Sequence, residues 1–155
     1  MSNKNNDDLK RQASENTLGL NPIIALRKKD LLASAKMVLS QAIRQPLHSV
    51  KHVAHFGVEL KNVMFGKSVL APESDDRRFQ DPAWSQNPLY KRYLQTYLAW
   101  RKELHDWIGD SNLSEQDISR GHFVINLMTE AMAPSNTAAN PAAVKRFFET
   151  GGKSL

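Results

Sequence analysis

Residues 77–100 read RRFQDPAWSQNPLYKRYLQTYLAW, and this stretch decides the fold class. It holds all three tyrosines of the chain and two of its three tryptophans. At about 100° of rotation per residue, the segment 88–108 places its rings on one helix face and its charges mostly on the other. Rings at helical spacing are typical of a core, whereas rings that stack on nucleobases stay exposed. The stretch therefore predicts a buried, aromatic-rich helix.

We expect this helix and the one that follows it to form most of the core. The indole of Trp84 should fix the preceding loop against the helix. The residues predicted to be structural core are Trp84, Tyr90, Tyr93, Tyr97, Trp100, Leu104, Ile125 and Met128.

Helix starts are marked by the dipeptide Asn-Pro, which occurs at positions 21–22, 87–88 and 140–141. Asparagine caps free backbone N–H groups, and proline at the first helical position loses no hydrogen bond. Ser114, with Asp117 three residues later, forms an acidic variant of the capping box. With no convincing strand pattern, we predict an all-α fold. Its five expected helices cover residues 22–44, 47–65, 88–108, 114–133 and 141–151.

The expected organisation has four parts. Residues 1–20 are predicted to be loosely ordered or disordered, and 21–66 to form two amphipathic basic helices. Residues 67–87, rich in proline and charge, are predicted to be a connecting loop, and 88–155 the helical core.

Composition excludes several kinds of site. The chain has no cysteine, so disulfides, thiolate metal sites and cysteine nucleophiles are absent from these 155 residues. Neither a signal-peptide pattern nor a run of 18 apolar residues occurs, and we expect a cytoplasmic protein. The net charge of +5 is concentrated in residues 1–67, which carry 11 Lys+Arg against 5 Asp+Glu.

His48, His52, His55 and Glu59 fall on one stripe of the second predicted helix. Two histidines at such spacing can chelate a metal ion. One helix does not easily aim three imidazoles at a single ion, however, and no second donor group is obvious elsewhere. We therefore predict a solvated polar face, with no metal and no cofactor. No catalytic glycine loop or nucleophile elbow is present.

Four stretches carry a resemblance to a known family: NKNNDDLKRQASENTLGLNP (3–22), QPLHSVKHVAHFGVELKNVMFGKS (45–68), APESDDRRFQDPAWSQNPLYKRYLQTYLAWRKELHDWIG (71–109) and FVINLMTEAMAPSNTAANPAAVKRFFETGGKSL (123–155). The most family-specific parts are residues 77–98 and 133–155. The whole chain resembles the amino-terminal region of class II polyhydroxyalkanoate synthases, acyltransferases that polymerise medium-chain (R)-3-hydroxyacyl-CoA with release of CoA. In that family the catalytic cysteine, histidine and aspartate belong to a carboxy-terminal α/β-hydrolase-like domain. The resemblance implies that this domain is missing here, and that none of the 155 residues is catalytic.

The resemblance implies a non-catalytic module at the surface of the polyester granule. Such a module would support dimerisation, contact granule-associated proteins and assist the catalytic domain. The apolar faces of the first two helices could serve this role, or could simply pack on the helices that follow. The candidate granule or partner contacts are Ile24, Leu31, Leu32, Val38, Leu39, Val50, Val53 and Leu60. The alternative is a basic helical module for an acidic partner or nucleic acid; with the family assignment, no nucleic acid is expected.

Overall fold

The computed structural model describes residues 28–151, with side chains from residue 31 onward. The described part is all-α and contains no strand. Its α-helices and two 3₁₀ turns are α2 (Lys28–Arg44), α3 (Pro46–Met64), η1 (Arg77–Phe79), α4 (Ala83–Gln86), α5 (Pro88–Gly109), α6 (Glu115–Ala131), η2 (Pro134–Asn136) and α7 (Pro141–Glu149).

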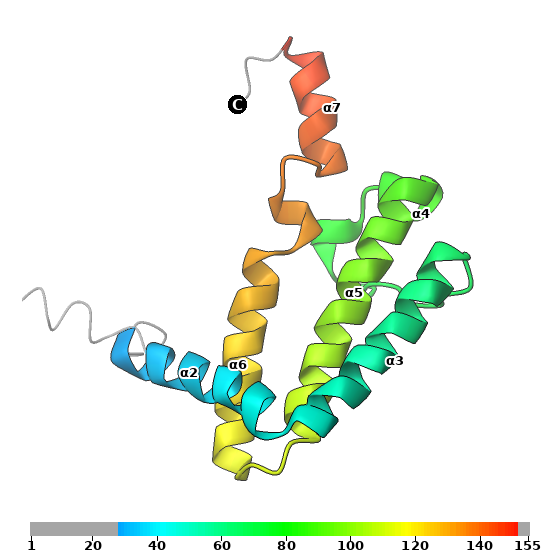
Figure 1. The fold of residues 1–155 in the computed structure, drawn as a ribbon. Coiled ribbons are helices and arrows are strands. Elements are labelled where there is room, and N and C mark those ends of the chain that lie inside the picture. Colours follow the sequence, from blue (N-terminus) through cyan, green and yellow to red (C-terminus); the bar gives the residue numbers. More distant parts are fainter. Residues whose placement is uncertain (1–27, 152–155) are drawn as a thin grey trace, which may run out of the picture.

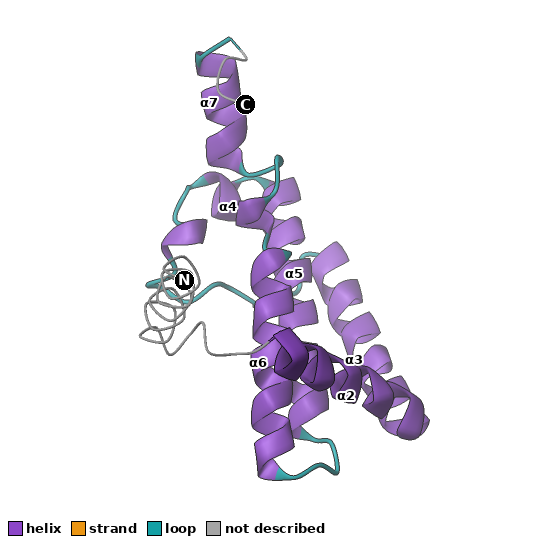
Figure 2. Cartoon of the chain, turned by 90° about the vertical axis from the view of Figure 1, so that its left-hand side faces the viewer, coloured by secondary structure: helices purple, strands orange, loops and turns teal. Residues whose placement is uncertain are grey.

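Helix α5 occupies the centre of the described fold (Figure 1). It packs against α3 on one side and α6 on the other, while α2 crosses α6 (Figure 2). The short helix α4 lies against the start of α5, and α7 projects beyond the other helices. Helices α2 and α3 meet at an angle and make few contacts with each other. Each of them is held mainly by a helix from the second half of the chain.

Helix starts follow the predicted capping chemistry wherever they can be described. The Asn87 side chain accepts hydrogen bonds from the backbone N–H groups of Leu89 and Tyr90, and Asn140 accepts one from Ala142. The Ser114 hydroxyl oxygen accepts one from the Asp117 N–H, at 3.2 Å. The predicted start at 21–22 lies outside the described residues, as does the segment 1–20.

The core consists of two clusters along α5. In the first, the Trp84 ring makes edge contacts with Phe79 and Tyr90, both with ring centroids 5.4 Å apart. Leu94, Tyr97 and Ala133 complete this cluster. The second cluster contains Trp107 and Ile108 of α5 and Ile125 of α6. None of the helices in residues 28–151 is long and apolar enough to cross a membrane.

The residues predicted as core lie at different depths. Trp84, Tyr97 and Ile125 are buried, and Tyr90, Trp100 and Leu104 are half-buried. Tyr93 and Met128 do not belong to the core, since they are 41% and 39% exposed. The reason for Met128 is that α6 buries only a narrow stripe, Gly121, Ile125 and Thr129. Tyr93 lies at the edge of the aromatic face, beside an open apolar groove that Phe56 and Met132 also line.

The connecting segment 67–87 is more ordered than a plain loop, because it contains η1 and α4. Arg78 donates hydrogen bonds of 2.8 and 2.7 Å to the two carboxylate oxygens of Asp76, which lowers the pKa of that carboxyl group. Arg78 also pairs with Glu130 of α6. The Gln95 side-chain amide of α5 donates to the carbonyl oxygens of Ser68 and Leu70, each at 3.0 Å. These contacts fasten the beginning and the middle of the segment to α5 and α6.

Candidate functional site

Helix α3 turns part of its histidine stripe inward, toward α5. His52 is only 4% exposed, and its Nδ1 lies 2.6 Å from Oε1 of Glu103. The Nε2 of His48 donates to the Trp107 carbonyl oxygen at 2.8 Å. The predicted solvated face is therefore wrong for these two histidines. The physical reason is that α5 supplies an acceptor for one ring nitrogen of each histidine, in the interior for His52 and at a half-buried position for His48.

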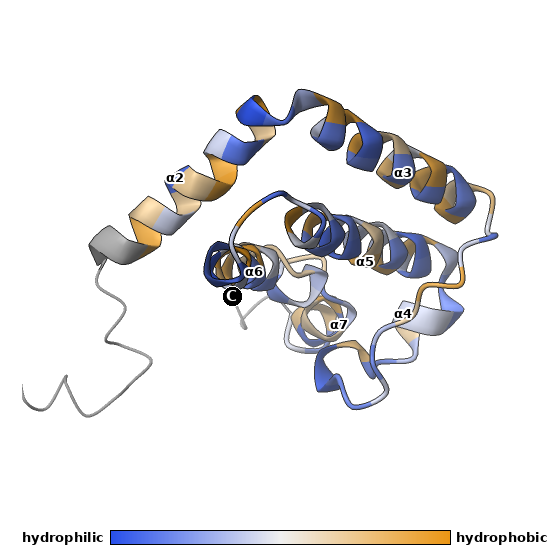
Figure 3. Cartoon of the chain, turned by 90° about the horizontal axis from the view of Figure 1, so that it is seen from below, coloured by the Kyte–Doolittle hydropathy of each residue, from blue (hydrophilic) through white to orange (hydrophobic). Residues whose placement is uncertain are grey.

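The apolar face of α3 is turned outward instead. Val50 and Val53 are 64% and 69% exposed, and Leu47 and Val58 are exposed as well. We call these four residues the α3 apolar stripe. Figure 3 shows the apolar residues along both α2 and α3. A helix that buries polar groups and exposes aliphatic ones leaves a surface that water solvates poorly.

The predicted granule or partner contacts divide into two groups. Leu32, Leu39, Val50 and Val53 are exposed. Leu31, Val38 and Leu60 are half-buried, and Ile24 lies outside the described residues. Val38 packs against the cluster of Trp107, Ile108 and Ile125, so the inner face of α2 serves internal packing.

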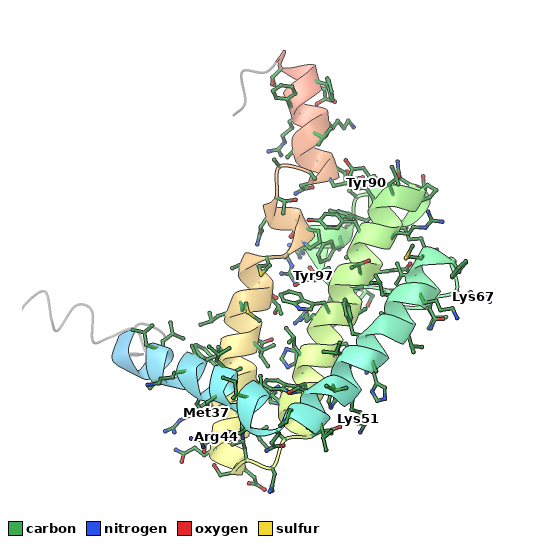
Figure 4. All side chains as sticks on the ribbon, viewed as in Figure 1. Met37, Arg44, Lys51, Lys67, Tyr90 and Tyr97 are labelled. Carbon is green, nitrogen blue, oxygen red and sulfur yellow. The ribbon has the colours of Figure 1, made fainter. Side chains whose placement is uncertain are left out.

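Basic side chains flank the exposed apolar surface. Arg44 and Lys51 lie on either side of the corner between α2 and α3 (Figure 4), and both are exposed. Ile43 and Leu47, four residues apart across that corner, are exposed beside them. This part of the molecule therefore combines aliphatic surface with positive charge, a combination found on helices that lie at apolar–aqueous interfaces.

An apolar cavity of about 290 Å³ lies where α2, α3 and α5 meet. Phe56, Trp100, Leu104 and Trp107 contribute to its wall, and His52 and Glu103 provide the polar part. The indole Nε1 of Trp107 donates to the Ser49 hydroxyl at 3.2 Å.

Two further histidines connect α5 to α6. The Nδ1 atoms of His105 and His122 lie 2.7 Å apart, and their rings are stacked. The pKa of His105 is lowered, first because burial disfavours the charged ring and also because His122 is close. The His122 ring beside it thus adds to the effect of burial in favouring the neutral form of His105.

Sequence reasoning missed Glu103 and Gln95, which it placed on the polar outer face of the aromatic helix. Both contact other parts of the chain, and Ala99 lies between them on the same stripe. Ala99 is buried and lines a cavity between α3 and α5. The sequence feature that could have predicted this contact is the spacing of residues 95, 99 and 103. Residues four apart lie on one helix face, so two polar groups and one small residue face the same neighbour.

Comparison with known proteins identifies the family. The family described as "Poly-beta-hydroxybutyrate polymerase (PhaC) N-terminus" matches residues 75–155, which is more than half of the chain. The chain belongs to this polymerase family. The matched residues include α5, α6 and the buried residues of both core clusters.

Relatives in the polymerase family match well beyond residues 75–155. The chain is 83% identical over all 155 residues to poly(3-hydroxyalkanoate) polymerase 1 of Ectopseudomonas oleovorans, of which it covers 28%. It is 47% identical over 135 residues to polymerase 2 of that organism, covering 87% of this chain and 24% of the relative. A polymerase subunit of Cupriavidus necator is 29% identical over 129 residues, 81% of this chain and 21% of the relative.

The chain thus spans about a quarter of the length of the curated relatives it matches, and corresponds to their amino-terminal part. The resemblance seen in the sequence is confirmed at the level of the family. No solved structure matches the chain.

Proposed function

We propose that this chain is the non-catalytic amino-terminal module of a polyhydroxyalkanoate polymerase, and that it holds the enzyme at the polyester granule. The observation that carries the proposal is the outward-facing α3 apolar stripe, Leu47, Val50, Val53 and Val58. All four side chains are mostly exposed, although Val53 and Val58 also border the cavities between α3 and α5. A polyester surface is apolar and extended, and it would remove such a stripe from water.

The energetics favour binding by several weak contributions. Fully burying an aliphatic side chain of this size contributes about 1.5–3 kcal/mol, so a few of them suffice for reversible attachment. Arg44 and Lys51 would remain in the aqueous layer beside the surface, as basic residues do on interfacial helices. Dimerisation and contact with granule-associated proteins would use the same kind of apolar surface.

The complete polymerase, in this proposal, links (R)-3-hydroxyacyl groups into polyester and releases CoA. Its cysteine nucleophile would reside in a domain outside these 155 residues, because the chain contains no cysteine. The check is CoA release from (R)-3-hydroxydecanoyl-CoA, followed with a thiol reagent. We expect none from this chain; release at a measurable rate would show that the chemistry has been assigned to the wrong part of the polymerase.

Granule attachment is tested by sedimenting the chain with protein-free polyhydroxyalkanoate particles. We expect the variant Leu47→Asp/Val50→Asp to bind at least tenfold more weakly, because both side chains face outward and their loss leaves the fold intact. The matched control is Val69→Asp/Leu89→Asp, which changes two equally exposed residues outside α3.

Equal binding by both double variants would contradict a role for the α3 apolar stripe. Analytical ultracentrifugation of the same proteins separates the two uses of the surface. If the stripe mediates dimerisation, the native chain is a dimer, and Leu47→Asp/Val50→Asp dissociates it while the control variant does not. If the stripe serves granule contact alone, all three proteins have the same oligomeric state.

A further inference from the structure

We propose that His52 and His55 of α3 and Glu103 of α5 form a binding site for a divalent transition metal, with Zn²⁺ as the fitting ion. The sequence argued against such a site because one helix offers too few donors. The fold removes that objection, since Glu103 approaches the histidine pair from a second helix. The site is independent of granule attachment.

Three donor atoms, one from each residue, lie within 4.8 Å of one another. The Nδ1 of His52 is 2.6 Å from Glu103 Oε1, and the Nδ1 of His55 is 3.6 Å from the same oxygen. Tetrahedral zinc with bonds of about 2.0–2.1 Å separates its ligand atoms by about 3.3 Å. The His55 contact already has this spacing. The His52 contact has to lengthen by about 0.7 Å, a change within reach of a small rotation of the Glu103 carboxylate.

The second ring nitrogen of His52 points to the same conclusion. Its Nε2 is buried and has no hydrogen-bond partner, which is costly for a polar atom in a protein interior. A metal ion on Nδ1 would place the ring proton on Nε2. That proton would face Oδ2 of Asp110, which lies 3.7 Å away. A carboxylate behind the metal-bound imidazole is the usual way in which proteins orient such a ligand.

The other members of the predicted stripe have different partners. His48 is committed to the Trp107 carbonyl oxygen. The Glu59 carboxylate accepts hydrogen bonds from Ser68 and Asn62, at 2.6 and 3.2 Å. The geometry therefore selects two of the four residues that share the stripe, and adds Glu103 to them.

Access and charge also fit a metal ion. A cavity of about 360 Å³ is lined by His55, Glu59, Glu103 and Asp106, and would leave a fourth coordination position open to water. Lys102 also lines it, but its ammonium group is paired with Asp106. Two imidazoles and one carboxylate suit zinc better than Ca²⁺ or Mg²⁺, which prefer oxygen ligands. A bound ion would clamp α3 onto α5.

The test is titration of the untagged 155-residue chain with ZnCl₂ by isothermal calorimetry, and with Co²⁺ by absorption spectroscopy. We expect one ion per chain, a visible Co²⁺ spectrum of low-symmetry coordination, and a higher melting temperature with zinc. The variant His55→Ala should weaken binding at least tenfold. Its side chain is 57% exposed, so the fold should persist, which circular dichroism checks.

The matched control is Glu59→Gln, which removes a carboxylate from the same cavity without removing a ligand and should change affinity less than threefold. Absence of stoichiometric zinc binding by the native chain would overturn the proposal. So would equal binding by the native chain and His55→Ala, or an equal loss in Glu59→Gln. Each of those results would make His52 and Glu103 a simple hydrogen-bonded pair between helices.

Discussion

Gly121 of α6 lies directly against the side chain of Ile108 of α5. A Cβ on residue 121 would overlap Cγ1 of Ile108 and lie 2.9 Å from its Cδ1. Ile108 is completely buried between the helices and cannot move aside easily. The glycine therefore sets the distance between α5 and α6.

Replacing Gly121 by alanine should destabilise the fold, although alanine in place of glycine usually stabilises a helix. Alanine is a better helix former than glycine by about 1 kcal/mol. Gly121→Ala should nevertheless lower the free energy of unfolding by about 1–3 kcal/mol, because overpacking forces the helices apart. Gly57→Ala in α3 is the matched control, since nothing lies within 4 Å of its added Cβ. It should stabilise the chain. Urea unfolding followed by circular dichroism measures both; stabilisation by Gly121→Ala would contradict the close approach.

Tyr97 and Tyr93 lie four residues apart on α5 and should differ sharply in their contribution to stability. Tyr97 is buried between α5 and α6 (Figure 4), and its hydroxyl donates to the Thr129 carbonyl oxygen at 3.1 Å. Tyr97→Ala should cost about 3–5 kcal/mol, as for other buried aromatic residues. Tyr93→Ala removes a ring at the surface and should cost less than about 1.5 kcal/mol. Similar melting temperatures for the two variants would contradict the burial of Tyr97.

The His105–His122 contact should make stability depend on pH. The pKa of His105 in the folded chain is below its unfolded value of about 6.5. The unfolded chain consequently binds more protons as the pH falls through 6.5, and the free energy of unfolding decreases toward lower pH. We expect a smaller decrease between pH 7.5 and 5.5 in His105→Gln, whose residue 105 cannot titrate. Equal decreases, measured by urea unfolding at both pH values, would exclude His105 as the cause.

The Gln95 side chain should hold the segment that follows α3 in its ordered conformation. Its amide donates to two backbone carbonyl oxygens, and Gln95→Ala leaves both without this donor. The expected cost is about 1–3 kcal/mol, with faster tryptic cleavage after Lys67. Gln80→Ala, at an exposed position in the same segment, is the control and should be cleaved at the native rate. Protection of Lys67 in both variants would show that other contacts hold the segment.

Helix positions were predictable from sequence because their signals are local. Asn87-Pro88, Ser114 and Asn140-Pro141 define three helix starts through bonds to their own neighbours. Tyr97 is buried, as the ring spacing of its helix predicts, and Trp84 is buried, as expected for a ring that fixes the preceding loop. Tyr93 departs from the pattern because the width of a buried face depends on the partner helix.

The orientation of α3 was not predictable in the same way. Its histidines and its valines occupy opposite faces, and hydropathy alone favours burial of the valines. The inward position of His48 and His52 depends on a carbonyl and a carboxylate contributed more than fifty residues later. Such a match between distant polar groups leaves no periodic signal in a single sequence.

The pairing of α2 with α6 and of α3 with α5 also fixes an order of events during synthesis. The first two helices leave the ribosome before either of their packing partners exists. Helix α3 can complete its contacts only after residue 109 has emerged, and α2 only after residue 131. Throughout this interval the nascent chain presents aliphatic side chains to water. Translation speed between residues 64 and 131 therefore sets how long the unfinished chain is exposed to chaperones and to aggregation.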